Sequence, residues 1–111
     1  MDRELVKEII NYEGQSSCLV LATIIATEGS SPRKTGAQML IFPRGNISGS
    51  IGGGSVEADI IKKGKVIIKN GSMKNKIKKY CYDMSNKEAA QVGGVCGGSV
   101  EILLETIDVG E

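Results

Sequence analysis

The chain has 111 residues and contains no histidine, no tryptophan, one phenylalanine and two prolines. Without histidine, most general-base mechanisms that operate near neutral pH are excluded. Because aromatic side chains are scarce, isoleucine, valine and leucine must fill the core. A chain of this length buries roughly 65% of its unfolded surface. We therefore expect one domain over residues 1–111, in which a core is possible without disulfides.

Membrane and metal signals are missing as well. No apolar run is long enough to span a bilayer, and no signal peptide is recognisable. The three cysteines are an odd number and widely spaced, unlike the paired ligands of structural zinc sites. We expect a reduced, cytoplasmic protein with no membrane contact and no metal ligated directly by the protein, apart from the chemistry of Cys96 described below.

The net charge is only +1, which implies no polyanionic partner. With so few aromatic residues for base stacking, nucleic-acid binding is disfavoured. The charge distribution is uneven, since eight lysines and no carboxylate lie between Ile61 and Tyr82. The simplest interpretation is a solvated helix face followed by a basic turn. The alternative is a surface that binds an acidic partner protein or a phosphate-bearing ligand.

The hydrophobic pattern predicts two helices and five strands in the order α-β-β-β-α-β-β. The fold class is therefore α+β, on a mainly antiparallel or mixed sheet. Leu5, Val6, Ile9 and Ile10 form the apolar stripe of the first helix, with Gly14 as its C-terminal stop. The predicted elements are a helix over 2–13, a central strand Cys18–Thr27, a hairpin of 37–42 and 46–50, a helix from Val56 to Gly71, and strands 76–84 and 99–107.

The pentapeptide Gly-Gly-Ser-Val-Glu occurs twice, at residues 53–57 and 97–101. The first copy ends a glycine cluster, Gly52, Gly53 and Gly54, at the predicted start of a helix. Unpaired amides and the positive end of the helix dipole make such a start an anion site. Ser55 is placed to cap the helix or to bind a phosphate. Glu57 stabilises the first turn but competes with an external anion, and a plain tight turn is the alternative interpretation.

The loop Gly29–Gly36 follows the predicted central strand directly. Arg33 can bind a phosphate or carboxylate bidentately, and Ser30 adds a hydroxyl. Pro32 fixes its own φ and restrains the residue before it, so Arg33 is presented from a stiffened loop. The alternative is an ordinary polar loop with two cations.

Cys96 lies between glycines, with Gly97 and Gly98 directly after it. Glycines do not shield the thiol, and exposed backbone amides would lower its pKa. A thiolate there permits nucleophilic attack, metal ligation or sulfur transfer. A buried, inert cysteine is the alternative, and residue statistics favour it for Cys18 and for Cys81.

Three ordered motifs resemble the N-terminal domain of the XdhC/CoxI family. They are Thr27-Glu-Gly-Ser-Ser-Pro-Arg-Lys-Thr-Gly-Ala-Gln-Met39, Gly49-Ser-Ile-Gly-Gly-Gly-Ser-Val-Glu57 and Val95-Cys-Gly-Gly-Ser-Val-Glu101. The resemblance runs from about residue 19 to residue 105. It implies an accessory protein, not an enzyme, that binds the molybdenum cofactor transiently. Such a chaperone matures hydroxylases of the xanthine dehydrogenase or carbon monoxide dehydrogenase type.

The resemblance also implies which residues hold the cofactor and which partners take part. The implied cofactor-binding residues are Gly29, Ser30, Arg33, Gly36, Gly52, Gly53, Gly54, Ser55, Glu57, Cys96, Gly97 and Gly98. Arg33 and the first cluster would hold the phosphate, and Cys96 would face the molybdenum. The implied partners are the apo-hydroxylase and a cysteine desulfurase, with a homodimer left open.

Two departures from the family pattern qualify these expectations. Family members often carry cysteine after the triple glycine, where this chain has Ser55, so it is expected to bind the cofactor without assisting its sulfuration if that cysteine is required. Many members continue into a Rossmann-like domain that this chain does not contain. We expect either a stand-alone short member or one half of a two-chain system in which a separate chain supplies that domain. Two other hypotheses stay open: a small enzyme with Cys96 as nucleophile, and an interaction module that docks through lysines 62–79.

Overall fold

The protein is described from a computed structural model that covers residues 3–14, 18–27, 34–70, 77–83 and 99–108. Its helices are α1 (Arg3–Ile10) and α2 (Gly54–Asn70). Its strands are β1 (Cys18–Thr27), β2 (Gln38–Ile41), β3 (Ile47–Gly49), β4 (Ile77–Asp83) and β5 (Ser99–Asp108). The predicted element order and the α+β class are confirmed.

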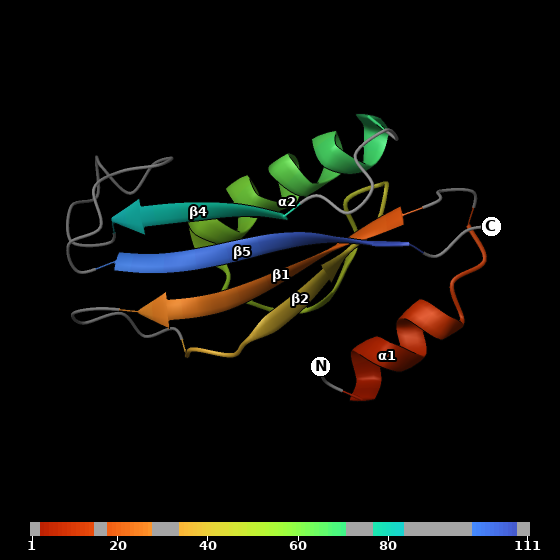
Figure 1. The fold of residues 1–111 in the computed structure, drawn as a ribbon, viewed down its shortest axis with the longest axis horizontal. Helices are drawn as coiled ribbons and strands as arrows, with labels where there is room; N and C mark the ends of the chain where they lie inside the picture. The colour runs from red at the N-terminus through yellow and green to blue at the C-terminus, as the bar shows by residue number, and fades with distance from the viewer. Residues whose placement is uncertain (1–2, 15–17, 28–33, 71–76, 84–98, 109–111) are drawn as a thin grey trace.

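The five strands form one antiparallel sheet in the order β3-β2-β1-β5-β4 (Figure 1). β1 lies in the middle, as its apolar character on both faces predicts. Its ladder with β5 runs from the Cys18–Asp108 pair to the Thr27–Val100 pair, and an irregularity in the register falls between Ile24 and Ala26. This bulge turns Ile25 outward, where it is 39% exposed.

One helix packs on each face of the sheet, because alternate residues of β1 point to opposite sides. Val20, Ala22 and Ile24 face α2 and belong to the larger core cluster with Val56 and Ile60. In this cluster α2 comes close to β2, since a Cβ added to Gly64 would lie 2.7 Å from the Ile41 Cδ1. The smaller cluster lies under α1 and consists of Leu5, Leu19, Leu21, Leu40 and Phe42.

The predicted apolar stripe of α1 is only half right. Leu5 is buried and Ile9 packs on the smaller cluster, whereas Val6 is 38% exposed and Ile10 is 74% exposed. A step of one residue rotates a side chain by about 100° on the helix. In so short a helix, the neighbours of Leu5 and Ile9 therefore pass beyond the edge of the contact. The helix also ends at Ile10, and Gly14 is not among the glycines with positive φ.

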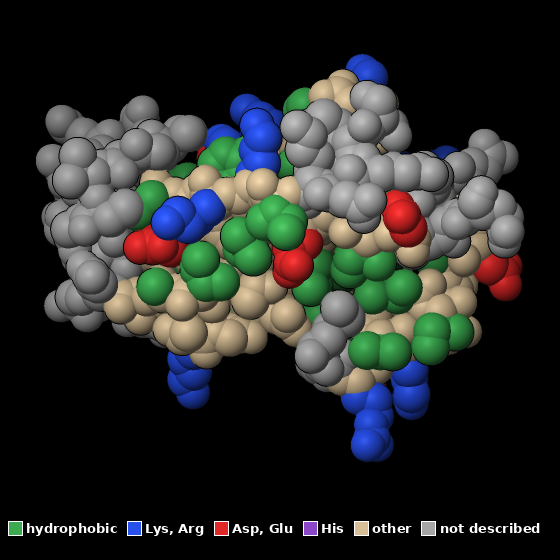
Figure 2. All heavy atoms as spheres, in the orientation of Figure 1, with side chains coloured by type: hydrophobic (Ala, Val, Ile, Leu, Met, Phe, Trp, Pro, Cys, Tyr) green, Lys and Arg blue, Asp and Glu red, His purple; other side chains and the backbone are tan. Residues whose placement is uncertain are grey.

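α2 lies behind the sheet in Figure 1, and α1 covers only part of the opposite face. On that face, hydrophobic side chains reach the surface beside acidic side chains and lysine or arginine (Figure 2). Ile77 on β4 is 63% exposed, and Lys79 forms an ion pair of 3.5 Å with Glu101 of β5. An edge strand with exposed lysines resists pairing with other sheets.

Candidate functional site

The topology brings the flanks of all three predicted motifs to one end of the sheet. β1 ends there at Thr27, which pairs with Val100 near the start of β5. β3 also ends there, since Gly49 pairs with Met39 near the start of β2. β4 completes the set, because Asp83 pairs with Ser99. Figure 1 shows the arrowheads of β1 and β4 at this same end. We call it the motif end of the sheet.

The first glycine cluster connects β3 to α2 at the motif end through residues with left-handed backbone. Gly49, Gly52, Gly53 and Gly54 have φ values of 86°, 114°, 75° and 75°. Side chains other than glycine adopt such values at a cost, so the clustering of glycine here follows from the path of the chain. The helix then begins at Gly54, as the sequence predicts to within two residues.

Glu57 reaches back from the first turn of α2 and closes this cluster. Its Oε1 accepts hydrogen bonds from the Ser50 hydroxyl at 2.8 Å, the Ile51 amide at 3.1 Å and the Gly53 amide at 3.0 Å. The Gly52 amide donates to the Ser50 Oγ at 3.0 Å. The amides of Ile51 and Gly53 therefore already bind an anionic oxygen, and Glu57 supplies that oxygen. The predicted competition between Glu57 and an external anion has a geometric basis.

Ser55 has a different place from the one that we expect for a helix cap. In the described part of the chain, Glu57 accepts from the Ile51 and Gly53 amides before α2, and Ser50 accepts from the Gly52 amide. Glutamate is long enough to return to residues before the helix, in the manner of the second half of a capping box. Ser55 itself is exposed.

Two glycines of the motif end leave space beside the backbone. Apart from the adjoining residues, a Cβ added to Gly53 or to Gly36 would meet no atom of the described residues within 4 Å. Gly36 has a φ of 96°, and its amide donates to the Ile24 carbonyl at 2.7 Å, so its position is fixed by β1. By contrast, a Cβ on Gly49 would lie 2.6 Å from the Gln38 carbonyl oxygen. Gly36 and Gly53 therefore allow another group to approach the backbone, whereas Gly49 serves the packing of β2 on β3.

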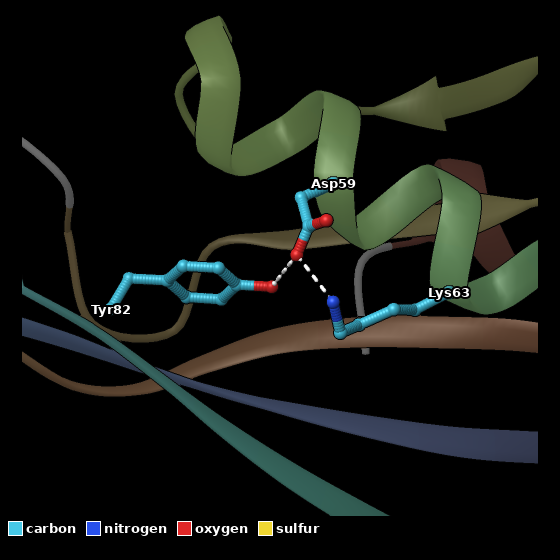
Figure 3. A network of polar contacts seen from close by, with 3 residues as sticks. All are labelled: Asp59, Lys63 and Tyr82. Atoms are coloured by element: carbon cyan, nitrogen blue, oxygen red, sulfur yellow. Dashed lines mark hydrogen bonds and ion pairs between the residues drawn. The ribbon is translucent and has the colours of Figure 1, made fainter. Parts of the chain in front are cut away.

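A buried tyrosine joins α2 to the edge strand near the motif end (Figure 3). The Tyr82 hydroxyl donates to the Asp59 Oδ2 at 2.6 Å, and the Lys63 ammonium contacts the same oxygen at 2.6 Å. Burial raises the pKa of Tyr82 strongly, and the neighbouring Asp59 carboxylate adds to the rise. Partial burial works to raise the pKa of Asp59, but the hydrogen bonds from Lys63 and Tyr82 outweigh it, so that pKa lies below its ordinary value of 3.8.

Replacing Tyr82 by Phe is expected to lower the free energy of unfolding by about 1–2 kcal/mol, because a hydrogen bond to a carboxylate is lost from a buried site. The contribution of Asp59, whose pKa is lowered, is present above its ordinary value of 3.8 and disappears as the pH falls below it. The contribution of Tyr82, whose pKa is raised, is present below 10.0 and declines as the pH rises beyond it.

Urea unfolding of the wild type and the Tyr82→Phe variant from pH 3 to pH 11 measures this difference. We expect it to be constant from about pH 5 to 9 and to shrink at both extremes. A difference that stays flat over the whole range would contradict the assigned network.

Half of the predicted site residues lie outside the described part of the chain. They are Gly29, Ser30, Arg33, Cys96, Gly97 and Gly98. The described members are Gly36, Gly52, Gly53, Gly54, Ser55 and Glu57, and the structure brings the last five together at the start of α2. The hypothesis of an enzyme with Cys96 as nucleophile therefore stays a prediction.

The two described cysteines differ in state. Cys18 forms no disulfide and is buried in β1, as predicted for a core cysteine. Cys81 on β4 is disulfide-bonded, contrary to the expectation of a wholly reduced chain. Thiol chemistry in this protein has to be measured with and without a reductant.

One well-defined cavity lies away from the motif end. It measures about 1060 Å³ and lies between the end of α1 and the β2–β3 turn, with Glu8, Glu13 and Arg44 in its lining. Two carboxylates make it a poor site for an anion, so we base the candidate site on the motif end. Among the described residues, no group of three or more potential ligands is arranged for a metal ion. None of the described helices has the length and apolarity needed to cross a membrane.

Sequence reasoning missed three contributors to the motif end, which are Ser50, Asp59 and Tyr82. Asp59 precedes Lys63 by four residues, a spacing that signals an ion pair on a helix. Ser50 and Tyr82 gave no such signal. The partner of Tyr82 is 23 residues away and on another element, so only the packed structure shows it.

Comparison with known proteins identifies relatives of this chain. The model of the XdhC and CoxI family matches residues 14–80. An uncharacterised protein of Escherichia coli strain K12, YqeB, is 32% identical over 97 residues, which are 87% of this chain and 17% of that protein. A protein of Bacillus subtilis strain 168, named as a probable subunit of xanthine dehydrogenase, is 48% identical over 44 residues, or 40% of this chain and 13% of that protein.

A solved structure has the same fold. The crystal structure of a xanthine dehydrogenase from Bacillus halodurans matches with a TM-score of 0.73 and 31% identity, over 96% of this chain and 30% of that one. The chain thus spans less than a third of the length of each of these relatives. Since the family model covers more than half of the chain and includes the first two motifs, the protein belongs to the XdhC and CoxI family.

Proposed function

We propose that this protein binds the molybdenum cofactor and acts as an accessory factor in the maturation of a molybdenum hydroxylase. Family membership carries the proposal, and the names of the Bacillus relatives, both linked to xanthine dehydrogenase, support it. The apo-hydroxylase is then the partner. A cysteine desulfurase and a separate Rossmann-domain subunit remain predictions from the family resemblance.

The motif end fits an anionic cofactor on two points. The amides before α2 bind a carboxylate oxygen, so this backbone is arranged for negative charge. Gly36 and Gly53 present bare backbone to an approaching group. The Ile51 and Gly53 amides are not available to the cofactor, however, because both already donate to Glu57. A cofactor phosphate would therefore be received by the first amides of α2 beside Ser55, with Arg33 as its counter-ion.

The remaining residues of the motif end have supporting roles in this proposal. Glu57 and Ser50 fix the path of the glycine cluster and so position the amides of α2. Cys96 would present its thiol toward the molybdenum. The cofactor, when bound, supplies the metal and its sulfur chemistry. Because Cys81 is disulfide-bonded, the thiol of Cys96 should be assayed in a protein whose disulfides have been reduced.

A matched pair of glycine variants tests the proposal. Gly53 and Gly45 have φ values of 75° and 95°, so alanine costs each about 1–2 kcal/mol of backbone strain. At Gly53 the new methyl group enters the open space of the motif end, whereas at Gly45 it meets the flexible Lys65 side chain at 3.1 Å. Gly53→Ala should lower the activation of xanthine dehydrogenase in a strain that depends on this chain, and Gly45→Ala should not.

Thermal unfolding of both variants provides the control for stability. Equal losses of activation in the two variants, in proportion to their stability, would contradict a ligand site at Gly53.

A further inference from the structure

The outer face of α2 carries a groove of about 560 Å³ that is distinct from the motif end. Its α2 lining includes Ala58, Ile61, Lys62, Lys65, Val66 and Lys69. These positions recur every three or four residues and so form one continuous stripe along the helix. The residues that α2 buries against the sheet, such as Val56, Ile60 and Gly64, lie on the opposite side of the helix. Pro43 in the β2–β3 turn forms the far wall of the groove.

The charged residues that line the groove are all positive. Lys62, Lys65 and Lys69 are exposed, and neither ion pair formed among the described residues includes them. From Ile61 to Asn70 the helix has no carboxylate at all. Lys63 is different, because it turns to the side and pairs with Asp59. Lys62 is also close enough to Asp59 to interact with its carboxylate, whereas Lys65 and Lys69 lie on turns of α2 that carry no acidic residue, so the stripe keeps a net positive potential.

The groove also has an apolar floor. Val66 is 54% exposed in the middle of the three lysines, Ala58 is exposed about two turns before it, and Ile61 is half-buried between them. The stripe from Ala58 to Lys69 is about 16 Å long, which corresponds to three turns of a helix. An amphipathic helix matches this arrangement. Its leucines would contact the apolar floor, and carboxylates at the borders of its apolar face would contact the lysines.

We propose that this groove docks an acidic amphipathic helix of a partner protein. Charge complementarity argues for an acidic occupant, and the apolar floor argues for a folded peptide face and against a simple anion. A lipid surface fits less well, because a helix that binds in a membrane interface needs large apolar residues, and this stripe exposes only alanine and valine beside its lysines. The proposal does not depend on the binding of a cofactor at the motif end.

Among the described lysines of the segment 62–79, those that line the groove are Lys62, Lys65 and Lys69. Lys78 and Lys79 lie on β4, where successive residues point to opposite faces of the sheet, and Lys79 pairs with Glu101. These two lysines belong to a different element and serve as a control. The double variants Lys62→Glu/Lys65→Glu and Lys78→Glu/Lys79→Glu change the net charge equally.

The test uses the reduced 111-residue chain labelled with ¹⁵N and a synthetic peptide of leucine, glutamate and alanine whose leucines fall on one helical face. A peptide of the same composition with scattered leucines controls for charge alone. We expect amide shifts on α2 between Ala58 and Lys69 and near Pro43, and about tenfold weaker binding after Lys62→Glu/Lys65→Glu. Lys78→Glu/Lys79→Glu should bind like the wild type, and Val66→Ser should weaken binding without any change of charge.

Each alternative outcome overturns the proposal. Equal binding of both peptides would leave only a non-specific cation surface, and equal loss in both double variants would place the contact elsewhere. Tighter binding to phosphatidylglycerol vesicles than to the peptide, lost in Lys62→Glu/Lys65→Glu, would assign the stripe to a membrane. The amide spectra of the variants show directly that each one is folded.

Discussion

Replacing Glu57 by Ala is expected to lower the free energy of unfolding by about 2–4 kcal/mol, because the Glu57 carboxylate gathers three donors that lie before its own helix. Without it, the amides of Ile51 and Gly53 lose an ionised acceptor. Ile51 is itself fully buried, so water cannot replace the whole of the loss. The start of α2 should loosen while the strands remain, and hydrogen exchange at residues 51–56 should rise before exchange in β1 and β5 does.

Glu57→Gln is the matched control, since it keeps the length and one carbonyl oxygen but removes the charge. We expect a loss of about 1 kcal/mol for this variant. Urea unfolding at neutral pH measures both values. If Glu57→Ala proved as stable as the wild type, the hydrogen bonds of Glu57 would not hold the glycine cluster. The same two variants bear on the site, because an external anion that competes with Glu57 should bind more tightly after Glu57→Gln.

Gly49→Ala is expected to cost about 3 kcal/mol of stability, more than alanine at Gly53. Two penalties combine at Gly49. Its φ of 86° is a conformation that side chains rarely adopt, and a Cβ would lie 2.6 Å from the Gln38 carbonyl oxygen. That oxygen belongs to the backbone of β2 and cannot move away without disturbing the pairing of β2 with β3.

Gly53→Ala separates the two penalties. Its φ is also left-handed, but its Cβ would meet none of the described residues within 4 Å beyond its chain neighbours, so only the backbone strain remains. Thermal and urea unfolding of the two variants should rank Gly49→Ala below Gly53→Ala by roughly 1–2 kcal/mol. Equal stabilities of the two variants would contradict the prediction, because the contact between the new Cβ at Gly49 and the Gln38 carbonyl oxygen would then add no cost.

Much of the fold follows from local sequence patterns. The apolar run Cys18–Thr27 is long, flanked by polar loops and rich in β-branched residues, and it forms the central strand β1. The alternation of Val100, Ile102 and Leu104 with Glu101 and Glu105 gives the face of β5 that lies in the core. These signals succeed because burial on one or both faces dictates them. At α1 the same reasoning predicts too wide a buried face. Val6 and Ile10 are apolar but exposed, and of the four apolar residues Leu5 and Ile9 pack on the sheet.

The candidate site is less accessible to such reasoning, because it depends on topology and on the reach of single side chains. Local patterns mark the glycine cluster as a turn into a helix, and this is correct. They do not show that the ends of β1, β3 and β4 lie together, which requires the strand order. Nor do they show that Glu57 in place of Ser55 takes the amides, since only the three-dimensional path from Ser50 to Gly53 brings them within its reach.

The lysine-rich segment illustrates the same limit. In the sequence, the lysines from Lys62 to Lys79 look like one basic region. In the structure, Lys63 pairs with Asp59, Lys79 pairs with Glu101, and Lys62, Lys65 and Lys69 share the outer stripe of α2. The helical period places Lys63 on a different side of α2 from Lys62, Lys65 and Lys69. Lys78 and Lys79 are separated from these four residues because they lie on β4. A charge run therefore becomes a surface only when its residues are placed on their elements.

The most direct measurement is the molybdopterin content of the wild-type protein purified with reductant, and without oxygen, from a host that makes the cofactor. Oxidation of the released pterin gives a fluorescent product that can be counted per protein chain. Binding at the motif end predicts a content approaching one per chain in the wild type and in Gly45→Ala, with most of it lost in Gly53→Ala. A wild-type protein that carries no pterin, or a Gly53→Ala variant that carries as much as Gly45→Ala, would contradict that site.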